Sequence, residues 1–95
     1  MLKKDLVDKV SSELSMQKQD VGLAVDIMLE TMAKALVEER RIELRGFGSF
    51  SVVHLASRLG RNPRSGEPVD IPQKRVARFK PGKALRVAVD QRSPL

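Results

Sequence analysis

The sequence predicts an α+β fold, and three observations lead to that prediction. Apolar residues recur at helical spacing over residues 2–36, they then alternate with polar residues as in strands, and the pair Pro81-Gly82 precedes a last short helical segment. The chain has 95 residues, three Phe and no Trp or Tyr, so we expect a single domain, residues 1–95, with a thin core. A core this thin favours assembly with a second subunit.

The first part of the chain, residues 1–40, is expected to be helical. Apolar residues recur every four positions in a short amphipathic helix: Leu2, Leu6, Val10 and Leu14. After a break around Ser15–Gln17, a longer helix is predicted, and its apolar stripe from Val21 to Leu36 is wider than a single seam. A helix this apolar has more than one surface to bury, and Met28 and Met32 are expected to pack within that stripe.

Residues 41–58 and 74–80 are expected to form a small antiparallel sheet. Side chains alternate between polar and apolar from Arg41 to Arg45, and Gly46-Phe47-Gly48 predicts a tight turn. A second strand is expected from Ser49 to Arg58.

Residues 59–73 are expected to form the far part of a long hairpin, which includes the stretch "GRNPRSGEP" at 60–68. Alternation resumes over residues 69–79, and a short C-terminal helix is predicted over residues 82–90. At about 3.3 Å per residue, such an arm extends roughly 20–25 Å, too exposed to bury a core. Its side chains must therefore find partners outside the fold.

The net charge of +6 is unevenly distributed along the chain. Residues 1–40 hold six Lys/Arg and eight Asp/Glu, a net charge of −2, whereas residues 41–95 hold twelve and four, a net charge of +8. A segregated positive surface indicates a polyanionic partner, nucleic acid ahead of membrane, although composition alone also fits a merely soluble basic chain.

Enzymatic and cofactor-binding patterns are not found in the sequence. His54 is the only histidine and there is no cysteine, so we expect no metal site and no histidine-based catalysis. Gly46-Phe47-Gly48 lacks the third glycine of a dinucleotide-binding fingerprint, because Ser51 stands there, and Gly60 and Gly66 do not have P-loop spacing. We therefore predict no enzyme activity, no cofactor and no small-molecule substrate. No apolar run approaches the ~20 residues that span a bilayer, and no secretory signal is expected.

Three blocks of sequence, "RIELRGFGSF" (41–50), "GRNPRSG" (60–66) and "FKPGKALR" (79–86), resemble the bacterial HU and integration host factor family in order and spacing. The resemblance covers essentially the whole chain. It implies an intertwined dimer with a helical base, a saddle of antiparallel sheet and two β-ribbon arms. It also implies minor-groove binding and bending of double-stranded DNA in the cytoplasmic nucleoid. The pair Glu43 and Arg45 resembles the pattern of the integration host factor β subunit, so a site-preferring subunit that acts in transcription, recombination or replication complexes is the alternative. Whether the second subunit is identical or a related chain is left open.

The resemblance also implies roles for individual residues. In the arm, Arg58, Arg61 and Arg64 would meet phosphates and the minor groove beside Asn62, and Pro63 would insert between base pairs. The alternative for Pro63 is an ordinary turn residue. Nearer the body, the implied DNA contacts are Lys3, Arg45, Ser49, Lys74, Arg75, Arg78, Lys80, Lys83 and Arg86. Phe47, Phe50 and Phe79 would pack where the subunits meet, although a core within one chain is the alternative.

The arm also departs from the family pattern. Val53, Leu55 and Leu59 are apolar where relatives are mostly basic or polar, and Glu67 and Asp70 make the returning strand less basic. The three apolar residues are an even number of positions apart, so in a continuous strand they lie on one face. They either pack under the body or support contacts between neighbouring bound dimers.

Two other function classes remain as alternatives. A module for RNA or single strands is disfavoured because no aromatic set offers a stacking surface, and the third class is a protein-interaction module.

Overall fold

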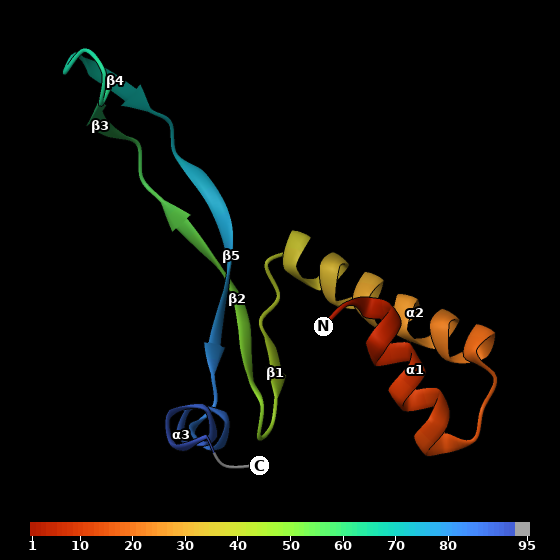
Figure 1. Cartoon of the computed structure of the whole chain (residues 1–95). Coiled ribbons are helices and arrows are strands. Elements are labelled where there is room, and N and C mark those ends of the chain that lie inside the picture. Colours follow the sequence, from red (N-terminus) through yellow and green to blue (C-terminus); the bar gives the residue numbers. More distant parts are fainter. Residues whose placement is uncertain (93–95) are drawn as a thin grey trace. The chain divides into compact units, whose positions relative to one another are not determined.

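The structure, a computed structural model, describes residues 1–92 and contains three helices and five strands in that part of the chain. The elements are α1 (Lys3–Leu14), α2 (Lys18–Val37), β1 (Ile42–Leu44), β2 (Gly48–Leu55), β3 (Arg58–Arg61), β4 (Pro68–Ile71), β5 (Lys74–Pro81) and α3 (Lys83–Gln91) (Figure 1). They group into two compact units, Met1–Ala35 and the chain from Leu36 onward. The predicted α+β class is confirmed.

The first unit is a pair of helices joined by a short turn. The side chain of Asp5 accepts a hydrogen bond from the backbone N–H of Leu2 at 2.7 Å, which satisfies a donor that the start of α1 leaves open. The helix ends at Leu14 and is capped by Ser15, whose backbone is left-handed with φ 52°. The break predicted around Ser15–Gln17 and both predicted helices are confirmed, with boundaries within three residues of the expected ones.

The apolar core of the single chain is very small. Val21 and Val25, 2% and 5% exposed, are the only buried apolar side chains among residues 1–92. Five other apolar side chains of α2 are about half exposed or more: Leu23, Ile27, Met28, Leu29 and Val37. A soluble protein rarely leaves such a surface uncovered, so α2 has an apolar face that needs a partner. No helix among residues 1–92 is long and apolar enough to cross a membrane.

The second unit is built on the antiparallel pairing of β2 with β5. The order of the sheet is β1-β2-β5, and its register places Phe50 opposite Phe79 and Ser51 opposite Arg78. Because paired residues share a face and successive residues alternate, one face carries Phe50 and Phe79 and the other carries Lys74, Arg78 and Lys80. The ring of Phe79 lies 4.8 Å from that of Phe50 and 5.5 Å from that of Phe47, between centroids.

The predicted strand from Ser49 to Arg58 is interrupted, and this part of the prediction is wrong. Pairing of β2 with β5 ends at Leu55–Lys74, and pairing of β3 with β4 begins at Arg58–Ile71. Each strand skips two residues, so the register is unchanged and no bulge is inserted. Pro72, which would face Ser57 in a continuous ladder, has no N–H to donate and accounts for the break. Figure 1 shows β3 and β4 at the end of the ribbon that lies away from α3.

A close approach explains the glycine at the start of β2. A Cβ built on Gly48 would lie 2.6 Å from the carbonyl oxygen of Lys80 and 2.6 Å from the ring of Phe79. The missing side chain therefore lets Phe79 lie over the strand and complete the aromatic cluster of Phe47, Phe50 and Phe79.

We expect the Gly48→Ala variant to be destabilised by about 1–3 kcal/mol, because the added methyl group overpacks this contact. Gly22→Ala is the matched control, since nothing lies within 4 Å of a Cβ at that helical position. The control should be neutral or slightly more stable. Denaturant unfolding midpoints test both variants, and equal midpoints for the two would contradict the packing argument.

We also expect the chain to be a dimer at micromolar concentration, with a thermal midpoint that rises with protein concentration, because two buried valines do not supply a core. Sedimentation together with thermal scans at several concentrations tests this. A stably folded monomer at those concentrations would show that the exposed face of α2 needs no second chain.

Candidate nucleic-acid interface

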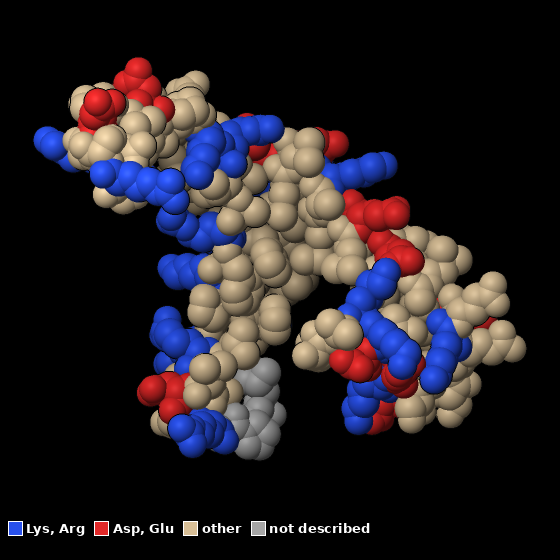
Figure 2. All heavy atoms as spheres, turned by 45° about the horizontal axis from the view of Figure 1, so that its top comes forward, with Lys and Arg blue, Asp and Glu red and all other residues tan. Residues whose placement is uncertain are grey.

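One face of the β1-β2-β5 sheet carries three of the four basic side chains of β5. The register pairs Ser49 with Lys80, Ser51 with Arg78 and Leu55 with Lys74, so these three cations lie on the same face. Figure 2 shows Lys and Arg side chains along one side of the second unit, from the β-ribbon to α3. The strand register thus turns basic residues spaced along the sequence into one surface.

At the end of this face that borders α3 lies an open groove of about 340 Å³. Five cationic side chains and one carboxylate line it: Arg41, Arg45, Lys80, Lys83, Arg86 and Glu43. The start of α3 also borders the groove, and Gly82 at its N-cap offers no side chain to satisfy the first N–H groups of the helix. Free N–H groups at a helix start favour anions, so the helix adds to the field of the side chains.

Contacts from the backbone and from Arg41 hold the groove together. The N–H of Gly82 donates to the carbonyl of Phe47 at 2.8 Å, which ties the β1-β2 turn to the start of α3. Across the groove, the guanidinium of Arg41 donates to Glu43 Oε1 at 3.0 Å and to Ser49 Oγ at 3.3 Å. Glu43 is therefore engaged by Arg41, and Arg45 has no ion-pair partner among residues 1–92.

The arm carries its basic residues around a compact tip. The N–H of Gly66 donates to the carbonyl of Asn62 at 2.8 Å, and the N–H of Arg64 donates to Asn62 Oδ1 at 2.9 Å. Gly66 has φ +71°, a conformation that favours glycine, and Pro63 begins the turn. The tip is exposed throughout, so Pro63 is presented to solvent by a hydrogen-bonded turn, and the side chain of Asn62 serves that turn.

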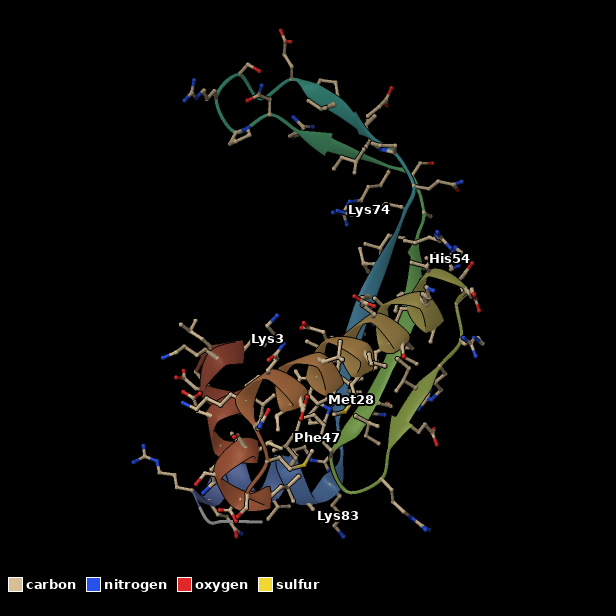
Figure 3. All side chains as sticks on the ribbon, turned by 90° about the vertical axis from the view of Figure 1, so that its right-hand side faces the viewer. Lys3, Met28, Phe47, His54, Lys74 and Lys83 are labelled. Atoms are coloured by element: carbon tan, nitrogen blue, oxygen red, sulfur yellow. The ribbon has the colours of Figure 1, made fainter. Side chains whose placement is uncertain are left out.

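Arg75 lies apart from the other cations of the ribbon. It pairs with His54 in the register, on the face opposite Lys74, and Figure 3 shows the side chains of Lys74 and His54 on opposite sides of the ribbon. The guanidinium of Arg75 donates to Glu39 Oε2 at 3.1 Å and to the carbonyl of Val37 at 3.5 Å, and His54 Nε2 also contacts the Glu39 carboxylate. The hydrogen bond from His54, followed by that from Arg75, lowers the pKa of Glu39 below its ordinary value.

The remaining predicted residues fall in both units. Lys3 is in the first unit, where its Nζ lies 2.8 Å from Asp26 Oδ1. Met28 is exposed and Met32 is half-buried on α2, whereas the three Phe form the cluster described above in the second unit. Whether these residues pack between subunits stays a prediction, as do the DNA contacts of individual side chains.

The prediction from sequence missed two parts of this region. Arg41 belongs to the groove, and the alternation of Arg41, Glu43 and Arg45 along one strand was the available signal. The cluster of Glu39, His54 and Arg75 joins residues far apart in sequence and depends on the strand register, so no local pattern indicates it.

The apolar residues of the outgoing strand differ in their surroundings. Val53 and Leu55 are half-buried in β2, and Leu59 in β3 is 72% exposed. The interruption at Ala56–Ser57 separates Leu59 from the other two, so the predicted strip is not one uninterrupted strand face.

A small α+β chain with a cationic groove, a basic sheet face and a basic β-ribbon is typical of DNA-binding proteins. The family model described as bacterial DNA-binding protein matches residues 1–90. The chain belongs to this family.

Its relatives include two of the proteins named in the sequence resemblance. The DNA-binding protein HU of Thermotoga maritima is 44% identical over 89 residues, which cover 94% of this chain and 99% of the relative. Integration host factor subunit beta of Marinobacter nauticus is 47% identical over 91 residues, 95% of this chain and 93% of the relative. Among solved structures, the HU–DNA cocrystal structure of Anabaena is similar with a TM-score of 0.85 and 37% identity, covering 94% of this chain and 97% of that chain. The predicted family is confirmed.

We expect Glu39→Gln to lower the unfolding midpoint, because it removes the carboxylate that holds His54 and Arg75. Since folding lowers the pKa of Glu39, its contribution is complete above the pKa of the unfolded chain and is lost as the pH falls through the lower folded-state pKa. Denaturant midpoints measured across the acidic range should therefore show a weaker pH dependence in the variant. Glu38→Gln, which changes the same charge one residue away, is the control, and an identical pH profile for both variants would contradict this assignment.

Proposed function

We propose that the chain acts as a dimer that binds double-stranded DNA in the minor groove and bends or compacts it in the bacterial nucleoid, without enzyme activity. The observation that carries this proposal is the continuity of positive charge in the second unit. The groove beside α3, the basic face of β5 and the ribbon tip follow one another along the same antiparallel ribbon. A duplex is a regular polyanion, and such a surface can contact successive phosphates along it.

Each part of this surface has a distinct role in the proposal. The groove, with Arg45, Ser49, Lys80, Lys83 and Arg86, binds backbone phosphates at the body. Lys74 and Arg78 extend that contact toward the arm, where Arg58, Arg61 and Arg64 meet the minor groove. Pro63 is fixed in the exposed tip by the turn, so it loses little freedom on insertion between base pairs, where it produces the bend.

Two predicted contacts are revised in this proposal. Arg75 supports the root of the arm through Glu39 and does not contact DNA, because it lies on the other face of the ribbon. Lys3 reaches a phosphate only by leaving Asp26, and since this pair is exposed, the exchange costs about 1 kcal/mol or less.

The second subunit is an identical or a related chain in this proposal. The exposed apolar face of α2 supports the dimer, and the likeness to an HU and to an integration host factor subunit supports both kinds of partner. Purification of the chain alone tests this choice, because a soluble DNA-binding homodimer shows that no related subunit is required.

A preference for particular DNA sites is a second candidate function. It is favoured by Arg45, which has no ion-pair partner among residues 1–92 and stands at the end of β1 beside the groove. An arginine in a narrow minor groove reads the shape of the duplex. Selection from random duplexes tests this function, and recovery of unenriched sequences would leave only the general architectural role.

The bending role of Pro63 is separable from phosphate binding. We expect Pro63→Ala to reduce the bend angle strongly while leaving the salt dependence of binding almost unchanged, because unstacking of bases and neutralisation of phosphates are separate contributions to binding. Energy transfer across an end-labelled duplex measures the bend.

The Arg61→Ala, Arg64→Ala double variant is the complementary control. It keeps the tip proline, and we expect the slope of log affinity against log salt to fall by about 0.9 for each phosphate that the variant no longer neutralises. An unchanged bend in the Pro63 variant would leave Pro63 as an ordinary turn residue.

A further inference from the structure

The part of the ribbon next to the arm has no third strand beside it. β1 pairs with β2 only as far as Phe50, so residues 52–55 and 74–77 form a ladder of two strands alone. Such a ladder is marginally stable in water. Directly beyond it, residues 56–57 and 72–73 have no ladder pairing. This end of the ladder therefore needs support from outside the ribbon.

Glu39, in the segment that follows α2, supplies that support. One oxygen of its carboxylate contacts His54 Nε2 of β2, and the other accepts a hydrogen bond from the guanidinium of Arg75 of β5 at 3.1 Å. His54 and Arg75 are paired with each other, one step from the end of the ladder. Among residues 1–92, the carbonyl of Val37 is the only other group outside the ribbon that forms a hydrogen bond with this ladder. A single carboxylate thus joins both strands.

The backbone of Glu39 is also unusual. It is left-handed, with φ 59°, and its N–H donates to the carbonyl of Leu36 at 2.9 Å in the turn that ends α2. Glycine adopts this conformation at a helix end with the lowest cost. Non-glycine residues held in it are frequent where the position of a side chain matters for function. The contacts of Glu39 with both strands of the ribbon account for a glutamate at this position.

We propose that Glu39 is a positioning residue for DNA bending, because it holds β2 and β5 together directly below the unpaired residues and so fixes the direction in which the arm leaves the sheet. This inference rests on the proposed function, since the direction of the arm matters only if the arm contacts a duplex. Glu39 acts from the face opposite Lys74 and Arg78, so it does not touch DNA itself. Without its carboxylate, the pairing of His54 with Arg75 frays and the unpaired segment extends toward the body.

Amide hydrogen exchange tests this support in the absence of DNA. In the Glu39→Gln variant, the hydrogen-bonded amides of residues 52–55 and 74–77 should exchange about two- to fivefold faster, the effect of losing an exposed ion pair. The amides of residues 48–50 should keep their rate, because β1 holds that part of β2. Glu38→Gln, which removes the same charge one residue away, is the matched control. Unchanged exchange in the two-stranded ladder, or equal acceleration in the control, would overturn the proposal.

DNA bending tests the positioning role. At a temperature where every variant is folded, Glu39→Gln should bend an end-labelled duplex less than the parent chain does. The slope of its log affinity against log salt should fall by about 0.9 for each phosphate that the arm no longer neutralises.

An exchange of charges provides the rescue. The double variant Glu39→Arg, Arg75→Glu keeps the net charge and again places a guanidinium and a carboxylate across the same contact, with the carboxylate opposite His54 in the ladder. It should restore the bend, whereas Arg75→Glu alone should not. A bend that stays at the parent value in Glu39→Gln, or that stays low in the double variant, would overturn the positioning role.

Binding to a shortened duplex separates failure of this inference from failure of the proposed function. The duplex is shortened until the Arg61→Ala, Arg64→Ala variant binds it as tightly as the parent chain, so that only the body makes contact. Glu39→Gln should bind this duplex like the parent chain, and weaker binding there would show a general loss of structure and overturn the positioning role. If the parent chain binds neither duplex, the proposed function is overturned, while amide exchange still decides whether Glu39 supports the ribbon.

Discussion

The antiparallel register between β2 and β5 is the constraint on which the rest of the second unit depends. It places Phe50 beside Phe79 on one face and aligns Lys74, Arg78 and Lys80 on the other. A shift of one residue in one strand would move its side chains to the opposite face, so the aromatic cluster and the cationic surface would be disrupted together. Burial of the rings and presentation of the charges are therefore two results of a single pairing.

The apolar face of α2 and the cationic sheet both bear on the free energy of folding. Two buried valines cannot offset the conformational entropy lost by the described residues 1–92, so folding of this sequence must draw on surfaces outside the single chain. The aromatic cluster is itself only partly covered, with Phe47 and Phe79 still 45% and 39% exposed. Assembly and DNA binding are thus parts of the same free-energy balance, in which the polyanion relieves repulsion among the cations.

Elements with a strong local pattern could be predicted from the sequence, and features set by strand pairing could not. The helical stripes, the alternation of β1 and β5, and the arm tip around Asn62–Gly66 follow from spacing and turn chemistry, and the structure has them. Arg75 lies on the same face of the sheet as His54 because the two residues are paired in the ladder. Its hydrogen bond to Glu39 depends on the position of the segment that precedes β1. Pro72 can be read from the sequence, but its interruption of the ladder becomes evident only when the register sets it opposite Ser57.

The four residues without ladder pairing, Ala56–Ser57 and Pro72–Gln73, form a hinge between the two parts of the ribbon. Bending at a continuous ladder strains hydrogen bonds along its whole length, whereas here four residues without ladder pairing absorb the deflection. The outer segment can swing to follow a curved duplex while β2 and β5 stay paired and the groove beside α3 keeps its shape. Compliance is therefore confined to these four residues, and the paired base stays stiff while the outer segment moves.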